Sequence, residues 1–181
     1  MIARTLRQAE AAPAAYPVVL GLSDAAAAID AEPVWRRIES YVAHRWTPRD
    51  VVWIVRGAGE WLPPLGPAAI TGVSSWSGGE WSPGMTLVKG PCGVSLAYDG
   101  PWRLEATVGD TADALPGDVA EAFRRLAEYL AAPDAIGIPG ASRYSVDLGR
   151  VSETISRRED HMARALINSG AADLLRPYRR A

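Results

Sequence analysis

The 181-residue sequence has few of the residues that carry chemistry in other proteins. It has one cysteine, Cys92, so no intrachain disulfide is possible and a reducing compartment is the simplest inference. It has two histidines, His44 and His161, and no spacing typical of a metal site, a catalytic triad or a phosphate-binding loop. We therefore expect no catalytic, cofactor-binding or metal-binding residues, histidines on solvated or satisfied surfaces, and Cys92 as a small buried hydrophobic residue.

Long apolar runs are also missing. No stretch approaches the roughly 20 apolar residues of a membrane span, and the N-terminal region lacks the continuous apolar segment of a signal peptide. These absences predict a soluble protein without a membrane partner.

Charge is nearly balanced, and only one of the 19 basic residues, Lys89, is a lysine. The net charge of −2 argues against a protein whose whole surface is built to bind nucleic acid. Residues 150–181 carry seven arginines and four acidic residues, so the rest of the chain is clearly acidic.

Helical patterns lie at both sides of the middle region. Ser23 is a good N-cap for a short helix over residues 23–31. Residues 32–46 place apolar side chains at three- and four-residue spacing, which predicts an amphipathic helix with His44 inside it. Residues 118–132 show the same spacing and end before Pro133, so they predict a second long helix.

Residues 51–108 instead predict a small antiparallel sheet or barrel of about five strands, because short β-branched and aromatic runs alternate with turn signals. Asp99-Gly100 is the clearest candidate for a hairpin turn. Five tryptophans fall in this region. We favour a role in the core of the sheet over exposure for sugar stacking. They are Trp53, Trp61, Trp76, Trp81 and Trp102.

The last part of the chain predicts a loop after Pro133 and then a helix, with Ser156 and Glu159 at capping-box spacing and Gly170 at the end. The final stretch, "LLRPYRRA", combines two leucines, a proline, a tyrosine and three arginines. Chain ends are usually polar and frayed unless something holds them. This segment therefore docks either on its own domain, against the helix at 118–132, or on another protein.

Four stretches together resemble the head–tail connector proteins, also called adaptor or head-completion proteins, of long-tailed phages and gene transfer agents. They are "LSDAAAAIDAEPVWRRIESYVAHRW", "WLPPLGPAAITGVSSW", "GPWRLEATVGDTADALPGDVAEAFRRLAEYLAA" and "GAADLLRPYRR". The resemblance covers most of the chain from about residue 20 onward, and it is a pattern of order with no diagnostic residues.

The resemblance implies an α+β fold, with a helical connector core, an inserted small antiparallel β subdomain and an extended C-terminal arm. A connector domain would span residues 1–150, with helices at 23–46 and 118–132 flanking the β region at 51–108. A helical arm for portal docking would span residues 151–181. The portal-binding residues that it implies are Leu174, Leu175, Arg176, Pro177, Tyr178, Arg179 and Arg180.

For function, the resemblance implies a structural virion protein that is not an enzyme. Such proteins form a dodecameric ring under the portal protein and join the DNA-filled head to a tail-side stopper or tail terminator protein. DNA passes through the ring without sequence-specific binding, and the particle assembles in the bacterial cytoplasm. Two alternatives stay open from the residues: a carbohydrate- or peptide-binding β module that uses exposed tryptophans, and, more remotely, an enzyme.

Overall fold

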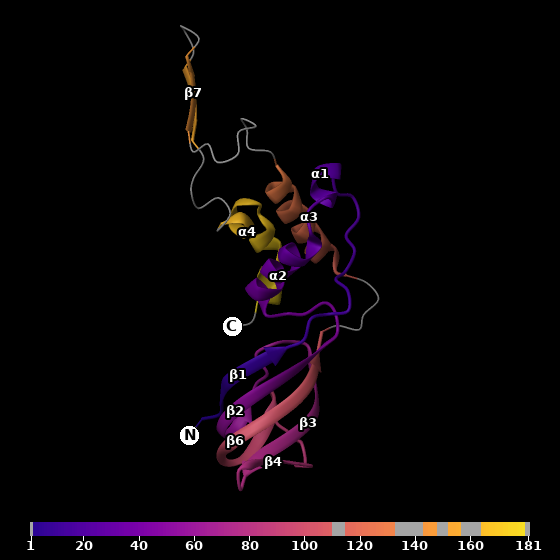
Figure 1. Cartoon of the computed structure of the whole chain (residues 1–181), viewed down its shortest axis with the longest axis vertical. Helices are drawn as coiled ribbons and strands as arrows, with labels where there is room; N and C mark the ends of the chain where they lie inside the picture. The colour runs from indigo at the N-terminus through magenta and orange to yellow at the C-terminus, as the bar shows by residue number, and fades with distance from the viewer. Residues whose placement is uncertain (1, 110–114, 133–142, 148–151, 157–163, 180–181) are drawn as a thin grey trace. The chain divides into compact units, whose positions relative to one another are not determined.

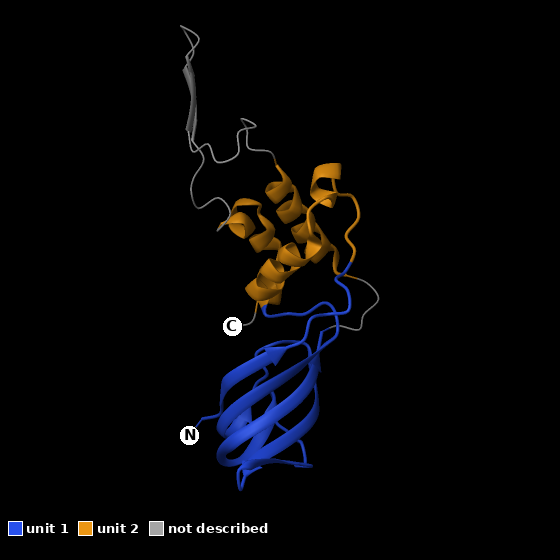
Figure 2. Cartoon of the chain, viewed as in Figure 1, with its two compact units in different colours: residues 1–17, 43–114, 180 blue, residues 18–42, 115–179, 181 orange. Residues whose placement is uncertain are grey.

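The structure is a computed structural model that describes residues 2–109, 115–132, 143–147, 152–156 and 164–179. The chain divides into two compact units (Figure 2). The β unit consists mainly of Met1–Pro17 and Ala43–Ala114, and the helical unit consists mainly of Val18–Val42 and Leu115–Arg179.

The β unit is built on a six-stranded sheet whose strand pairs are all antiparallel (Figure 1). The strand order is β1-β2-β6-β3-β4, and β5 pairs with β6. The strands are β1 (Arg4–Glu10), β2 (Arg49–Trp61), β3 (Ala68–Ser77), β4 (Glu80–Pro83), β5 (Val88–Lys89) and β6 (Val94–Val108).

Alternating residues of the two long strands form the core of this sheet. Val51, Trp53 and Val55 of β2 are buried, and Leu104 of β6 faces Trp53 in the register. Indole groups fill much of the space, as predicted: Trp53 and Trp61 pack edge to face, with their centroids 5.3 Å apart. The core prediction is therefore confirmed for Trp53, Trp61 and Trp102, which are all at most 3% exposed.

The helical unit contains α1 (Asp24–Ala27), α2 (Ala31–Val42), α3 (Gly117–Ala131), α4 (Ala165–Asn168), α5 (Ala171–Leu174) and the 3₁₀ turn η1 (Arg176–Tyr178). Within it, α3 contacts α1, α2, α4 and α5. Trp35 and Phe123 pack with their ring centroids 4.8 Å apart in the core between α2 and α3. A two-stranded antiparallel sheet of β7 (Arg143–Asp147) and β8 (Ser152–Ser156) also belongs to this part of the chain.

The prediction of a helical connector core with a small inserted β subdomain and an extended arm is wrong. The antiparallel sheet is the dominant element of the described residues, and most of the helices are short. β2 and β6 run for 13 and 15 residues, and β1 adds a strand that the sequence pattern did not show. The C-terminal residues are not extended, because they form α5 and η1. The predicted domain boundary at residue 150 lies outside the described residues.

The predicted hairpin turn at Asp99-Gly100 is also wrong, because β6 continues through it. On β2 the register shifts between Gly57 and Gly59, which pair with Gly100 and Leu96 of β6. The extra residues of β6 form an irregularity opposite these glycines. The indole Nε1 of Trp102 donates to the carbonyls of Gly57 and Tyr98 there, both at 3.2 Å.

Local helix signals gave mixed results. Ser23 caps α1, with its Oγ accepting from the Ala26 amide at 3.2 Å, and α3 lies where the second long helix was expected. The first long helix, however, ends at Val42 instead of residue 46. Ala43 adopts a left-handed φ of 55°, and His44 then pairs with Gly66 in an isolated bridge of the β unit. The predicted cap residue Ser156 ends strand β8.

Candidate functional site

The C-terminal segment, residues 164–179, packs on helix α3 within the helical unit (Figure 1). Gly170 starts α5 with a left-handed φ of 73°, a conformation that glycine adopts without steric cost. The amide of Leu175 then donates to the carbonyl of Ala171 at 3.2 Å. Because Leu175 is 0% exposed, it is a core residue of the helical unit and not a free docking side chain.

Tyr178 ties the end of the segment to the first turn of α3. Its hydroxyl donates to the carboxylate of Asp118, at 2.8 Å from Oδ1 and 3.0 Å from Oδ2. Burial raises the pKa of Tyr178, and the hydrogen bond and negative charge of Asp118 raise it further. Asp118 also accepts from the amide of Val119 at 2.9 Å. The neutral phenol is therefore the form that holds the segment in place.

Three side chains near the end of the segment, Arg176, Pro177 and Arg179, are exposed. The Arg179 guanidinium lies 4.8 Å from the centroid of the Tyr41 ring, a cation–π contact. Arg176 pairs with Asp173 at 2.8 Å, and both side chains are 78% exposed. Such a surface ion pair contributes little to stability, so Arg176 is available to a partner.

The structure thus separates the seven predicted portal-binding residues into two groups. Leu175 is buried, and Leu174 and Tyr178 are half-buried. Arg176, Pro177 and Arg179 are exposed, and Arg180 lies outside the described residues. In the single chain, the buried group docks the segment on its own helical unit, which is one of the two alternatives that the sequence left open.

Sequence reasoning missed an ion-pair cluster in the β unit. The Glu10 carboxylate accepts from Arg45 Nε at 2.5 Å and Nη2 at 2.9 Å, and from Arg49 Nη1 at 3.3 Å. Burial raises the pKa of Glu10, but the hydrogen bond and charge of Arg45, together with those of Arg49, outweigh this and lower it. The cluster fixes the end of β1 against the start of β2, and only the folded chain brings its members together.

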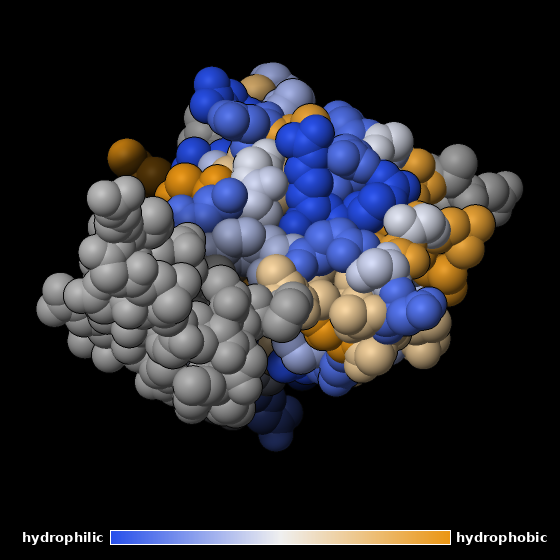
Figure 3. Space-filling view, turned by 90° about the horizontal axis from the view of Figure 1, so that it is seen from above, coloured by the Kyte–Doolittle hydropathy of each residue, from blue (hydrophilic) through white to orange (hydrophobic). Residues whose placement is uncertain are grey.

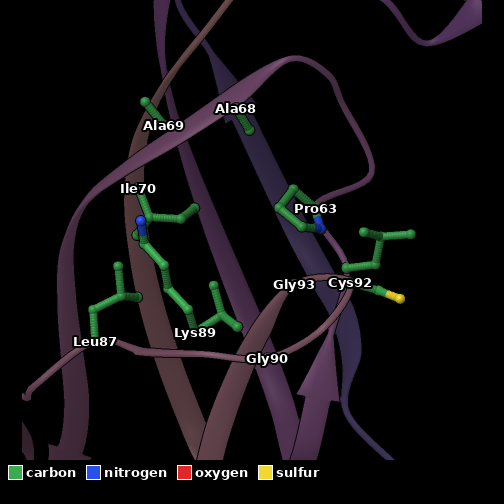
Figure 4. A pocket seen from close by; sticks show the side chains of 11 residues that line it. Pro63, Ala68, Ala69, Ile70, Leu87, Lys89, Gly90, Cys92 and Gly93 are labelled. Carbon is green, nitrogen blue, oxygen red and sulfur yellow. The ribbon is translucent and has the colours of Figure 1, made fainter.

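A pocket of about 510 Å³ lies beside β3 and β5 in the β unit (Figure 4). Its lining is mostly apolar and includes Ile70, Leu87 and the aliphatic part of Lys89. Cys92 lies at its rim, and its sulfur points away from Ile70 and Lys89 in Figure 4. The prediction that Cys92 is buried is wrong: the residue is exposed. Its loop is held by Glu60 Oε1, which accepts from the Cys92 and Gly93 amides at 2.6 and 2.9 Å.

The other candidate residues lie apart from one another within the described parts of the chain. No group of three or more His, Cys, Asp or Glu side chains there is arranged to hold a metal ion. His44 packs against Trp46, with ring centroids 4.8 Å apart, and His161 lies outside the described residues. Among the helices described, none is long and apolar enough to cross a membrane.

One of the seven tryptophans, Trp76 on β3, is exposed, next to the edge strand β4. Trp76 is 44% exposed and packs edge to face on its cross-strand partner Trp81, with centroids 5.0 Å apart. One exposed ring, itself covered on one side, is a small platform for a sugar, so nothing here favours the carbohydrate-binding alternative. In the view of Figure 3, hydrophilic side chains gather in the middle of the described surface, with apolar residues beside them.

Comparison with known proteins identifies the fold. No protein-family model and no curated protein matches the sequence. Among solved structures, a chain from the neck of a native gene transfer agent (GTA) particle, computed with C12 symmetry, is similar with a TM-score of 0.53. It is 17% identical, over 83% of this chain and 80% of that chain. A chain from the virion of a native GTA particle has a TM-score of 0.50 and 20% identity, over 90% of this chain and 80% of that chain. The chain therefore shares its fold with chains of the neck and virion of GTA particles.

Proposed function

We propose that this chain is a structural virion protein, a head–tail connector that forms a ring under the portal and joins the DNA-filled head to the tail. The observation that carries the proposal is the fold shared with a GTA neck chain over 83% of this chain. That neck was computed with C12 symmetry, which supports a ring of twelve copies here as well. The role needs binding surfaces and no catalysis.

The exposed half of the C-terminal segment is the proposed portal contact. Leu175 and Tyr178 hold the segment on α3, and they thereby present Arg176, Pro177 and Arg179 to a neighbouring protein. A presented surface of this kind costs less ordering entropy on binding than a flexible arm would. Arginine also offers a planar set of donors that fits a carboxylate with two parallel hydrogen bonds.

The other proposed partners follow from the ring. Each copy contacts two neighbouring copies through different surfaces, because a closed ring requires a heterologous contact. A tail-side stopper or tail terminator protein binds on the side away from the portal, and DNA passes through the opening.

The test is electron microscopy of particles from a producing strain that lacks this chain. We expect DNA-filled heads and free tails that do not join, and normal particles when the chain is supplied again. An Arg176→Ala/Arg179→Ala variant should fold but fail to restore joining, and Arg36→Ala should restore it. Arg36 is the matched control because it is an exposed arginine, paired with Glu32 at 2.6 Å on α2. Complete tailed particles without the chain would refute the proposal.

A further inference from the structure

Four arginines gather on one face of the β-unit sheet, and we call this set the arginine face: Arg4, Arg7, Arg56 and Arg103. The strand register places them together, because Arg4 lies opposite Arg56, and Arg7 and Arg103 lie on either side of Ile54. The two β2 residues next to Ile54, Trp53 and Val55, are fully buried. Since side chains alternate along a strand, the arginine face is on the side of the sheet away from the core.

Most of the positive charge on this face has no counter-charge. Arg4, Arg7 and Arg56 are exposed, and within the described residues no carboxylate forms an ion pair with them. Only Arg103 is paired, with Glu105 at 2.7 Å. Arg4 directly opposite Arg56 is a like-charge cross-strand pair, which destabilises a sheet. An anionic partner on this face would relieve that repulsion.

On the other side of the same sheet, arginines do have a carboxylate partner. There, Arg45 and Arg49 are both held by the carboxylate of Glu10. The chain thus supplies a carboxylate where arginines have a structural role, and it supplies none to the three exposed arginines of the outer face.

We propose that the arginine face binds the phosphate backbone of double-stranded DNA without reading its sequence. Strands lie about 4.8 Å apart and alternate residues about 7 Å apart, so the four arginines cover roughly 10 by 7 Å. A duplex carries one negative charge per roughly 1.7 Å of its axis, so it meets several of these arginines in any register. An acidic protein, in contrast, would bind this face only if its carboxylates were placed to match the positions of the arginines. The inference extends the proposed function, in which DNA passes the protein, but its test does not require attachment to heads.

The experiment measures binding of the purified full-length chain to a labelled duplex of mixed sequence by fluorescence anisotropy. With three to four phosphates neutralised, the affinity should fall about 40- to 150-fold between about 50 and 200 mM salt. Arg4→Ala/Arg7→Ala/Arg56→Ala should remove this salt-dependent binding. The corresponding triple lysine variant should keep it, because an ammonium group also neutralises a phosphate. Arg36→Ala, on the helical unit, should bind as the native chain does.

Four results would overturn the proposal. The first is no binding of the native chain at the lower salt concentration. The second is binding that the triple alanine variant retains. The third is tighter binding to a single-stranded oligonucleotide of the same sequence than to the duplex, lost in Trp76→Ala, which would assign the face to unpaired bases. The fourth combines two observations: the native chain does not bind DNA, and the triple alanine variant folds but fails to associate with neighbouring protein subunits. That combination would assign the face to an acidic protein. Failure of head attachment alone concerns the proposed function and leaves this result unaffected.

Discussion

Replacing Leu175 with alanine tests whether the C-terminal segment belongs to the core of the helical unit. Leu175 is 0% exposed and follows α5, which packs on α3. The substitution removes three buried carbon atoms, and their transfer to water alone costs about 2.4 kcal/mol. The cavity left behind adds to this, because the surrounding helices relax only partly. We expect the helical unit to lose about 3 kcal/mol of stability.

The assay must report on the helical unit by itself, because the chain has two compact units that need not unfold together. Amide hydrogen exchange of α3 does so. A loss of about 3 kcal/mol should accelerate the slowest α3 amides on the order of 100-fold. Arg176→Ala is the control: its side chain is 78% exposed, and the change should cost less than about 0.5 kcal/mol. Unchanged α3 exchange in Leu175→Ala would refute the reasoning and restore the interpretation of the segment as a free arm.

Three further predictions concern single side chains. Tyr178→Phe should cost the helical unit about 1 kcal/mol at neutral pH, through the lost bonds to Asp118. The pKa of Tyr178 is raised in the folded chain, so its contribution to the stability of the helical unit is complete below the ordinary pKa of 10.0. This contribution is lost as the pH rises through the pKa of the folded chain. Hydrogen exchange of the α3 amides as a function of pH measures the loss. Glu10→Gln should cost the β unit about 2 kcal/mol in denaturant unfolding. Because the pKa of Glu10 is lowered, its contribution to the stability of the β unit is present above pH 4.5 and is lost as the pH falls through the pKa of the folded chain. The stability of the Glu10→Gln variant should therefore depend less on pH in the acid range. Cys92→Ser should shift the thermal midpoint little, because Cys92 is exposed, and a thiol reagent should label the native chain without denaturant; slow labelling would contradict the exposure.

Local patterns predicted those elements whose cause is local. The apolar spacing of α3 and the cap at Ser23 depend on residues a few positions apart, and both are present. The core position of Trp53 also follows from alternation within a single strand. These features need no knowledge of the rest of the chain.

Long-range contacts explain what the sequence did not predict. β1 is almost wholly exposed, so it lacks the alternation that marks a strand. It is held by side-chain bonds to distant indoles: Trp53 donates to Gln8 at 2.9 Å, and Trp61 donates to Thr5 at 3.0 Å. In the same way, the polar dipeptide at residues 99–100 predicts a turn locally, but two glycines on the neighbouring strand turn it into an irregularity within β6. The helical connector core was implied by the resemblance alone, and the long antiparallel strands of the β unit overturn it.

The C-terminal segment shows how much of the candidate functional site the sequence could predict. Its composition predicted docking, because leucines, a tyrosine and arginines at a chain end need a surface. The docking surface, however, depends on Asp118 and the buried face of α3, which lie far away in the sequence. Contact with the portal stays a prediction, now carried by the exposed Arg176, Pro177 and Arg179.

The most direct measurement of the central claim is electron cryomicroscopy of the neck of the particles that contain this chain. The connector proposal predicts a ring of twelve copies between portal and tail, with the C-terminal segment of each copy against the portal. Density for the chain elsewhere in the particle, or a neck that is complete without it, would contradict the account.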